Sequence, residues 1–290
     1  MQNNTKKIFC VDIGGTKTAF ALFDENGNEL FYDLFETRPS EGAIRLVQRV
    51  YERVKSLVNG VSHGVIASPG PLNAHTGMIE YVATMGWKNV PITRLFEEAF
   101  GFAFSLLNDC DAGGLGVWKY CGFSEYKNLC YISISTGIGG GAIVNGKLHT
   151  GKGNAGNFGH IPVTGEGLLC GCGGVDCLEL YASGSGMENR YKAQTGNKLS
   201  CAEIATLARK GEKQALAIFQ TASEKLIFAL RAVIATLDPE LIVLGGSVCK
   251  SKDLFLPQVQ KALPALRIEH APDTGKQVLY GALAYGLQSR

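Results

Sequence analysis

The chain has 290 residues, of which 46% are hydrophobic and 19% charged, enough to bury one large core or two smaller ones. Its formal net charge is +2, and no run of basic residues marks a surface for nucleic acid. The longest apolar runs, such as Leu241–Leu244, are far shorter than the about 20 residues of a membrane span. The start from Met1 to Lys7 is polar and unlike a secretory signal. The sequence therefore predicts a cytoplasmic globular protein that binds neither nucleic acid nor membranes.

Two strand pairs with glycine turns occur in the chain. The apolar run Ile8–Asp12 ends at Gly14-Gly15, and a second run, Thr18–Phe23, ends shortly before Asn26-Gly27. Runs bounded in this way predict antiparallel strands joined by tight turns. The same layout recurs at residues 129–146, where a glycine turn separates two apolar runs and Asn-Gly follows. This recurrence predicts an internal duplication with two halves of similar design.

Helical patterns follow each strand pair. Apolar residues recur at helical spacing between Ser40 and Leu57, and Ser200 with Glu203 forms a capping-box signature. The pattern after Ser200 predicts a long helix that ends near Leu237, followed by a buried strand at residues 241–244. Residues 278–287 predict a last helix. The mixture is typical of α/β domains, with a boundary predicted near residues 118–126.

The glycine turn at residues 137–142 formally matches the dinucleotide fingerprint. That fingerprint needs a helix after the turn, whereas Ala142–Val144 and the next Asn-Gly predict a returning strand, which disfavours a dinucleotide-dependent enzyme. No Gly-Lys-Ser or Gly-Lys-Thr of a P-loop is present. The turns at 12–16 and 135–139 instead each offer backbone N–H groups and one hydroxyl, from Thr16 or Thr136, that suit a phosphate.

Cysteine spacing indicates a metal site. Of nine cysteines, three lie together at Cys170, Cys172 and Cys177, and His160 precedes them. Taken alone, the three could be free thiols in a glycine loop. The four residues together are zinc-type ligands, and four protein ligands predict a closed, structural site rather than a catalytic one.

In this order, the motifs resemble the ROK (repressor, open reading frame, kinase) family of sugar kinases and related repressors. Val11–Lys17 is similar to its first phosphate loop and Ser135–Gly141 to its second. Asn108-Asp109 resembles its catalytic step, residues 159–160 and 170–179 its zinc region, and residues 244–246 its adenosine-side loop.

The resemblance implies an α/β protein with two duplicated actin-like (hexokinase/RNase H-like) domains and an interdomain active-site cleft. We expect an N-terminal domain at residues 1–118, completed by a C-terminal helix at 276–290, and a C-terminal domain at 119–275. Nine residues precede Cys10, too few for the DNA-binding module of the repressor members. The expected protein is thus an ATP-dependent sugar kinase and a homodimer, which uses ATP, Mg2+ and a structural Zn2+.

The resemblance also implies individual roles. Asp109 would be the general base, although an Asn-Asp after a strand is by itself more typical of a turn or helix cap. The expected sugar-binding residues are Asn108, Asp109, Asn157, His160 and Glu179. The expected ATP and phosphate ligands are Asp12, Gly14, Gly15, Thr16, Lys17, Thr136, Gly137, Gly139, Gly245 and Gly246. The expected metal ligands are His160, Cys170, Cys172 and Cys177.

Two departures from the family pattern concern the sugar. Asn157 stands where the family usually has Glu, and Ala83-Thr84-Met85 precedes Gly86-Trp87 where an Asn is common. Glucokinases generally keep that Glu, so the change to Asn favours an N-acetylhexosamine, or a hexose other than glucose, as the substrate. The sequence leaves open which sugar is used, and a sugar-sensing protein without catalysis remains the alternative.

Overall fold

The structure is a computed structural model that describes residues 6–153, 155–272 and 275–288. Residues 1–5 of the polar start and residues 289–290 of the predicted last helix lie outside the described residues. The chain divides into two compact units. Unit 1 comprises Met1–Phe123, Thr150–Asn154 and Gly275–Arg290, and unit 2 comprises Ser124–His149 and Ala155–Thr274. The C-terminal helix therefore belongs with the N-terminal part of the chain.

Unit 1 is built on a five-stranded sheet with the order β3-β2-β1-β4-β8. Its first three strands are antiparallel neighbours, whereas β4 and β8 run parallel to β1. The strands are β1 (Lys7–Ile13), β2 (Lys17–Asp24), β3 (Glu29–Glu36), β4 (Val61–Ser68) and β8 (Phe104–Asn108). A smaller antiparallel sheet contains β5 (Leu72–Asn73), β6 (Met78–Val82) and β7 (Trp87–Val90). The predicted pair at residues 8–23 is confirmed as β1 and β2.

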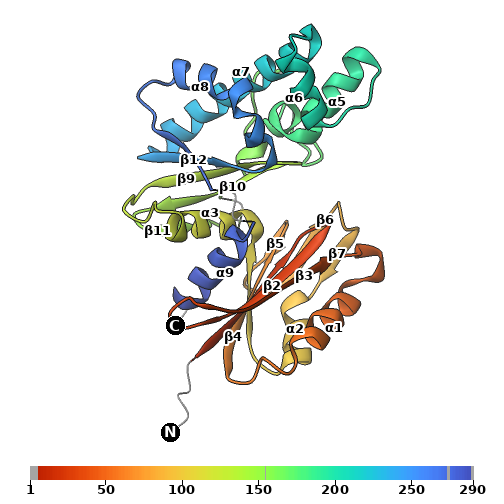
Figure 1. Ribbon diagram of the computed structural model, residues 1–290, viewed down its shortest axis with the longest axis vertical. Helices are drawn as coiled ribbons and strands as arrows, with labels where there is room; N and C mark the ends of the chain where they lie inside the picture. Colours follow the sequence, from red (N-terminus) through yellow and green to blue (C-terminus); the bar gives the residue numbers. More distant parts are fainter. Residues whose placement is uncertain (1–5, 154, 273–274, 289–290) are drawn as a thin grey trace. The chain divides into compact units, whose positions relative to one another are not determined.

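Alternation along β1 explains how the sheet of unit 1 is covered on both faces. Phe9, Val11 and Ile13 belong to one buried cluster, and Ile8 and Cys10 belong to another, because successive side chains of a strand point to opposite faces. Helices α1 (Ala43–Val54) and α2 (Ile92–Phe100) supply the first cluster, and α9 (Gln277–Gln288) supplies the second. Figure 1 shows α1 and α2 on the side of this sheet opposite to α9. The described part of the unit also contains η1 (Pro39–Glu41) and α3 (Asp109–Tyr120).

Unit 2 repeats the same sheet. Its strand order is β11-β10-β9-β12-β13, with three antiparallel strands followed by two parallel ones. The strands are β9 (Leu129–Ile134), β10 (Ile138–Val144), β11 (Lys147–His149), β12 (Leu241–Gly245) and β13 (Ile268–His270). The glycine run at 137–142 thus lies in a β-hairpin and not at a helix N-terminus, so the dinucleotide alternative is wrong.

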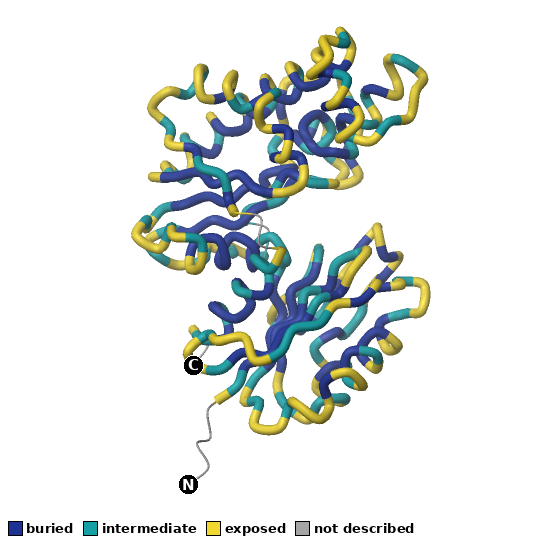
Figure 2. Tube along the Cα trace, in the orientation of Figure 1, coloured by how far each residue is buried: buried dark blue, intermediate teal, exposed yellow. Residues whose placement is uncertain are grey.

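The helices of unit 2 pack on its sheet through one large apolar cluster that includes Ile132 of β9 and Phe219 of α7. They are η2 (Phe158–His160), α4 (Glu179–Ala182), α5 (Gly184–Thr195), α6 (Cys201–Arg209), α7 (Lys213–Leu237), η3 (Ser247–Leu254) and α8 (Leu256–Ala262). In both units the buried residues concentrate in the central strands and on the inward helix faces (Figure 2). Among the described residues, no helix combines the length and apolarity needed to cross a bilayer.

The long helix predicted from Ser200 to Leu237 is two helices. The capping box of Ser200 and Glu203 is confirmed at the start of α6. Gly211, however, has φ +85°, a conformation that cannot continue an α-helix. Glu212 then caps α7 by accepting hydrogen bonds from the N–H groups of Gln214 and Ala215. A glycine that sequence pattern alone allows within a helix therefore ends one here.

Candidate active site and metal centre

The first glycine turn, residues 14–16 between β1 and β2, is closed by Gly14 N–H, which donates to Lys17 O at 3.0 Å. Thr16 and Lys17 are exposed, so the turn presents backbone and side-chain donors to its surroundings. Thr84 of the predicted sugar loop lies beside the turn, since a Cβ on Gly15 would be 3.3 Å from Thr84 Oγ1. The sequence correctly predicts this turn, and the structure places one of the two departures next to it.

Two buried threonines hold the first turn in place. Thr37 Oγ1 donates to Gly14 O at 2.6 Å, and Thr37 N–H donates to Thr16 O at 2.9 Å. Thr18 Oγ1 lies 2.9 Å from Thr37 Oγ1, and neither threonine is more than 1% exposed. A hydroxyl has one proton, so Thr18 donates to Thr37 while Thr37 donates to the turn. Sequence reasoning missed this pair, because nothing local to Thr37 indicates a contact 23 residues away.

Three carboxylates gather near the ends of β1 and β8 in unit 1. Burial raises the pKa of Asp109, and burial with the charge of Asp109 raises the pKa of Asp12 to about 7. The same two causes raise the pKa of Asp111 to about 7, and its Oδ1 is buried without a hydrogen-bond partner in the described part of the chain. Buried carboxylates close enough for the charge of one to raise the pKa of two others favour a bound cation or a proton.

Asn108 fixes the start of the helix that carries Asp109. The strand β8 ends at Asn108, and Asp109 is the first residue of α3. Asn108 Oδ1 accepts hydrogen bonds from Cys110 N–H at 2.9 Å and Asp111 N–H at 3.3 Å, as a helix N-cap does. The carbonyl oxygen of the Asn108 amide is thereby occupied, which leaves its Nδ2 donors for another group.

The second glycine turn, residues 135–137 between β9 and β10, has different neighbours. Ile138 N–H donates to Glu179 Oε2 at 2.9 Å, and a Cβ on Gly137 would lie 2.5 Å from the same oxygen. A larger residue at 137 would therefore have to displace the Glu179 carboxylate from this contact. Of the predicted sugar-binding residues, the structure places Glu179 directly against the phosphate turn.

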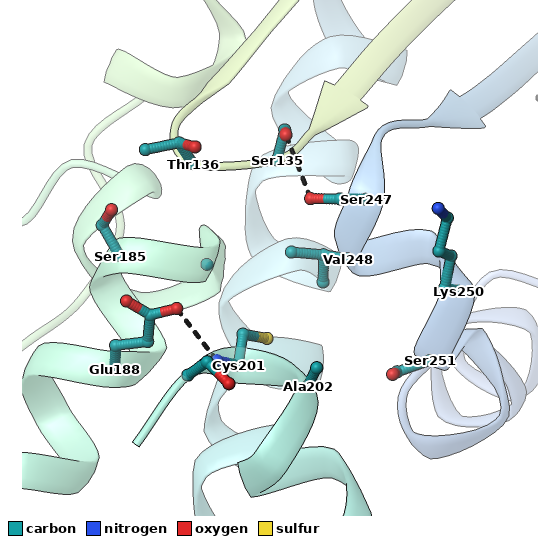
Figure 3. Close-up of a pocket in the computed structure, with 12 residues that line it drawn as sticks. Ser135, Thr136, Ser185, Glu188, Cys201, Ala202, Ser247, Val248, Lys250 and Ser251 are labelled. Carbon is teal, nitrogen blue, oxygen red and sulfur yellow. Dashed lines mark hydrogen bonds between the residues drawn. The ribbon is translucent and has the colours of Figure 1, made fainter. Parts of the chain in front are cut away.

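A pocket of about 340 Å³ lies beside this second turn within unit 2. Figure 3 shows Ser135 and Thr136 on one side, η3 on another, and the first residues of α5 and α6 opposite. Ser135 Oγ lies 3.0 Å from Ser247 Oγ, and Cys201 N–H donates to Glu188 at 2.9 Å. The pocket is lined by Ser135, Thr136, Gly184, Ser185, Glu188, Ser200, Cys201, Ala202, Ser247, Val248, Lys250 and Ser251.

The predicted adenosine-side glycines shape this pocket without lining it. Gly246 has φ +89°, and a Cβ there would lie 2.3 Å from Ile134 O. That geometry lets the chain turn from β12 into η3, so that Ser247 and Lys250 reach the pocket. Sequence reasoning missed Glu188 and Lys250, because no local motif marks either residue as part of a pocket. Beside this pocket, only the capping box at Ser200 predicted a helix start.

The four predicted metal ligands do come together. The ligand atoms of His160, Cys170, Cys172 and Cys177 all lie within 4.8 Å of one another. Cys172 Sγ is 3.5 Å from Cys177 Sγ, and Cys170 Sγ is 3.7 Å from His160 Nδ1. A tetrahedral zinc with Zn–S near 2.3 Å separates its ligand atoms by roughly 3.5–3.8 Å. The donor set and its spacing therefore fit zinc.

Backbone contacts keep the metal loop compact. Cys170 N–H donates to Gly174 O at 2.8 Å, and Gly174 N–H donates to Cys172 Sγ at 3.4 Å, which lowers the pKa of that thiol. Asp176 accepts hydrogen bonds from Gly167 N–H, Leu168 N–H and the Tyr181 hydroxyl. Asn157 is exposed and immediately precedes η2, the short helix that ends at His160.

Two sheets of the same strand order, each with a phosphate-type turn between its first two antiparallel strands, define a duplicated α/β protein of the actin-like fold. A ROK hexokinase from Thermus thermophilus matches with a TM-score of 0.87 and 27% identity, over 98% of this chain and 99% of that one. A ROK glucokinase from Streptomyces griseus, solved with glucose and AMPPNP, matches with a TM-score of 0.79 and 26% identity, over 98% and 100% of the two chains.

The model of the ROK family matches residues 8–279, and the chain belongs to this family. A glucokinase of Streptomyces coelicolor is 30% identical over 87% of this chain and 85% of its own. An N-acetyl-D-glucosamine kinase of Haemophilus influenzae is 31% identical over 88% of each chain. An N-acetylmannosamine kinase of Vibrio cholerae is 29% identical over 97% of each chain. The family predicted from the motifs is thus confirmed.

Proposed function

We propose that this protein is a sugar kinase that transfers the γ-phosphoryl group of ATP to the 6-hydroxyl of a hexose or an N-acetylhexosamine. Membership of the ROK family and relatives named as glucose, N-acetylglucosamine and N-acetylmannosamine kinases support the class of enzyme. The observation that carries the proposal is that the chain holds both a buried carboxylate cluster, in unit 1, and a phosphate turn with an adjoining pocket, in unit 2.

In the proposed mechanism, Asp109 accepts the proton of the sugar hydroxyl. Its position at the first turn of α3, fixed by the Asn108 cap, holds the carboxylate in one place. Its raised pKa brings it closer to the operating pH, as suits a general base. Phosphoryl transfer otherwise needs positioning and charge neutralisation more than covalent help from the protein.

Asp12 and the two turns would bind the triphosphate and its metal ion. Mg2+, bound with ATP, would supply neutralisation of the phosphate charge, and Mg2+ uses few carboxylates together with phosphate oxygens. Asp12, at the end of β1, is the carboxylate that we assign to this ion or its waters. The backbone N–H groups and hydroxyls near Gly14, Gly15, Thr16, Lys17, Thr136, Gly137 and Gly139 would hold phosphate oxygens.

The pocket beside the second turn would take the adenosine of ATP. Its volume of about 340 Å³ suits a nucleoside, and it opens directly from Thr136, where the phosphates would begin. Gly245 and Gly246 set the path of η3 along one wall. The solved relative that contains AMPPNP supports a nucleotide site in this fold.

We assign a structural zinc to His160, Cys170, Cys172 and Cys177. Four protein ligands fill a tetrahedral site and leave no open position for catalysis. The Nδ1 atom of His160 faces the cluster, so its Nε2 remains for a sugar hydroxyl. Asn108, Asn157 and Glu179 would supply further hydrogen bonds to the sugar.

A coupled ADP-release assay over glucose, mannose, fructose, allose, N-acetylglucosamine and N-acetylmannosamine tests the proposal. Hexose-dependent ADP release is the expected result. If no sugar causes ADP release while sugar binding is still measurable by calorimetry, the kinase proposal would give way to the sugar-sensing alternative. We also propose a cytoplasmic homodimer, and sedimentation of a single monomeric species at working concentration would contradict the dimer.

A further inference from the structure

A short segment of unit 2, residues 177–186, connects the cysteine cluster to the second phosphate turn. It begins at the metal ligand Cys177, continues through α4, and ends in the first turn of α5. Both of its ends make hydrogen bonds with other parts of the site. The segment therefore links the position of the cysteine cluster to the position of the second phosphate turn.

At its metal end the segment is paired with the chain that carries His160. Leu178 N–H donates to Ile161 O at 3.0 Å, and Pro162 and Cys177 form an antiparallel bridge. Cys177 Sγ also lies 3.8 Å from the carbonyl oxygen of His160. A metal bound by His160 and Cys177 would therefore fasten this pairing.

The segment holds the turn through three hydrogen bonds, two from its far end and one from Glu179 near its metal end. Gly184 N–H donates to Ser135 O at 2.7 Å, and Ser185 N–H donates to Thr136 O at 3.2 Å. Ile138 N–H donates to Glu179 Oε2 at 2.9 Å, a contact between residues 41 positions apart. Glu179 is the only side chain among these three bonds, and it stands two residues after Cys177.

The segment is itself stiffened by Ser183. The Ser183 hydroxyl donates to Glu179 O at 2.6 Å and accepts from Gly186 N–H at 2.9 Å. Ser183 is fully buried. Glu179 and the start of α5 are thereby fixed to each other, so that they contact the turn as one body.

We propose that Glu179 is a positioning residue for the nucleotide, through which the metal centre supports ATP binding as well as sugar binding. The inference rests on the proposed function and extends it. One carboxylate oxygen braces the second phosphate turn at Ile138, and the other remains for a sugar hydroxyl. A single half-buried side chain thus joins the two substrates' sites.

Calorimetric titration with a non-hydrolysable ATP analogue and Mg2+, without sugar, tests the bracing directly. Glu179→Ala should weaken nucleotide binding by about tenfold, the effect of one lost hydrogen bond at a buried N–H. Glu179→Gln should stay within about twofold of the wild type, because the amide oxygen still accepts from Ile138 N–H. Glu224→Ala, an exposed position on α7 of the same unit, is the matched control and should leave binding unchanged.

Steady-state kinetics separate this role from a purely structural one. Glu179→Ala should raise the KM of both ATP and sugar, whereas Glu179→Gln should raise the KM of sugar alone. Equal losses of nucleotide affinity in the two variants would overturn the proposal, because the N–H acceptor would then not matter. If Glu179→Ala fails to fold, Glu179→Asp, which keeps the charge but is one methylene shorter, should show the weakened nucleotide binding instead.

Removal of the metal is the second test of the proposal. Chelation of the wild type should weaken binding of the analogue, and chelation of Glu179→Ala should weaken it much less, because contributions that act through one residue are not additive. Full nucleotide affinity in the metal-free wild type would overturn the metal's part in the inference. A wild type that binds no analogue at all would refute the proposed function, whereas wild-type binding that is unchanged in Glu179→Ala refutes only the role of Glu179.

Discussion

The two glycine turns occupy the same position in sheets of the same strand order, but different residues surround them. The first turn is held by the hydroxyls of Thr18 and Thr37 and lies in the unit with Asp12 and Asp109. The second is held by Glu179 and the start of α5 and opens on the pocket of about 340 Å³. A hairpin turn offers an anion the same backbone groups in both cases. What differs is the chemistry that the rest of each unit adds: acids in one, a nucleoside-sized pocket and a metal loop in the other.

This contrast separates the expected effects of substitutions. Changes in unit 1 near the acids should reduce the rate of the chemical step. Changes in the metal loop and the second turn should reduce binding and the stability of unit 2. Variants that violate this division would show that the duplicated turns have not diverged in role.

The largest expected effect is that of Asp109→Asn. Removing a positioned base typically lowers kcat by about 10²–10⁴-fold, and the amide has the same shape, so sugar affinity should change little. The melting temperature should not fall, because burial disfavours the charge that the variant removes. Coupled kinetics and calorimetry on the same preparation measure both. Asp33→Asn, at a carboxylate of β3 in the same unit that forms an ion pair with Arg53, is the control for kcat. If more than a tenth of wild-type kcat survives, Asp109 is not the base.

The metal centre gives the second prediction. Cys172→Ser should lose the zinc and destabilise the loop that carries Glu179, because binding energy at a structural zinc site is folding energy. Elemental analysis should find about one zinc per wild-type chain and much less in the variant. Cys121→Ser, in unit 1 and outside the cluster, should keep the metal. A metal-free wild type with full activity would contradict the assignment.

Sequence reasoning predicted the elements whose signals are local. The strand pairs, the capping box at Ser200 and the last helix are confirmed, since strand alternation, glycine turns and caps are read within a few residues. The helix break at Gly211 was missed, because a glycine in a helical pattern reveals its φ only in the folded chain.

The contacts that hold the two glycine turns could not be predicted from the sequence, for a different reason. Thr37 meets Gly14 across 23 residues and Glu179 meets Ile138 across 41, so each depends on how the sheet and helices pack. Lys250 and Glu188 reach the pocket in the same way. The base was predicted only because the motifs resemble a family, whereas the cysteine spacing with His160 already indicated the metal ligands. The chemical roles of both remain predictions.

Asp111 provides a test that depends on pH. Its side chain is buried, and its pKa of about 7 lies above the ordinary 3.8. Between these two pKa values the folded state keeps a proton on Asp111 that the unfolded state releases. Burying this carboxyl therefore costs no folding stability below pH about 4. The cost grows as the pH rises and is complete above pH about 7. Asp111→Asn should gain stability on the order of 4 kcal/mol at pH 8 and much less at pH 4. Urea unfolding at the two pH values measures this, and a gain that does not vary with pH would show that Asp111 is not the titrating group.

The brace of the first turn gives a smaller effect. Thr37→Val keeps the shape but leaves Gly14 O and the Thr18 hydroxyl without their buried partner, which should cost about 1–3 kcal/mol of stability. Urea unfolding should show the loss, with nucleotide binding weakened through the first turn. Thr206→Val, on the exposed side of α6, is the matched control and should be nearly neutral. Equal stability of the two variants would mean that the threonine pair does not hold the turn.

The smallest expected effect concerns Asn157, which lies in the metal region of unit 2 and departs from the family pattern. An amide both donates and accepts hydrogen bonds, whereas a carboxylate only accepts, so the two residues satisfy different sugar substituents. An unpaired polar group costs about 1–3 kcal/mol, enough for roughly tenfold discrimination between sugars. Asn157→Glu should therefore shift the ratio of kcat/KM toward glucose and away from the native sugar. The KM of ATP should be unchanged, because Glu179, Gly184 and Ser185 hold the second turn. Kinetics of both proteins on the same panel of sugars measure the ratio. An unchanged ranking of sugars would assign specificity elsewhere, first to Thr84, which lies beside Gly15 in unit 1.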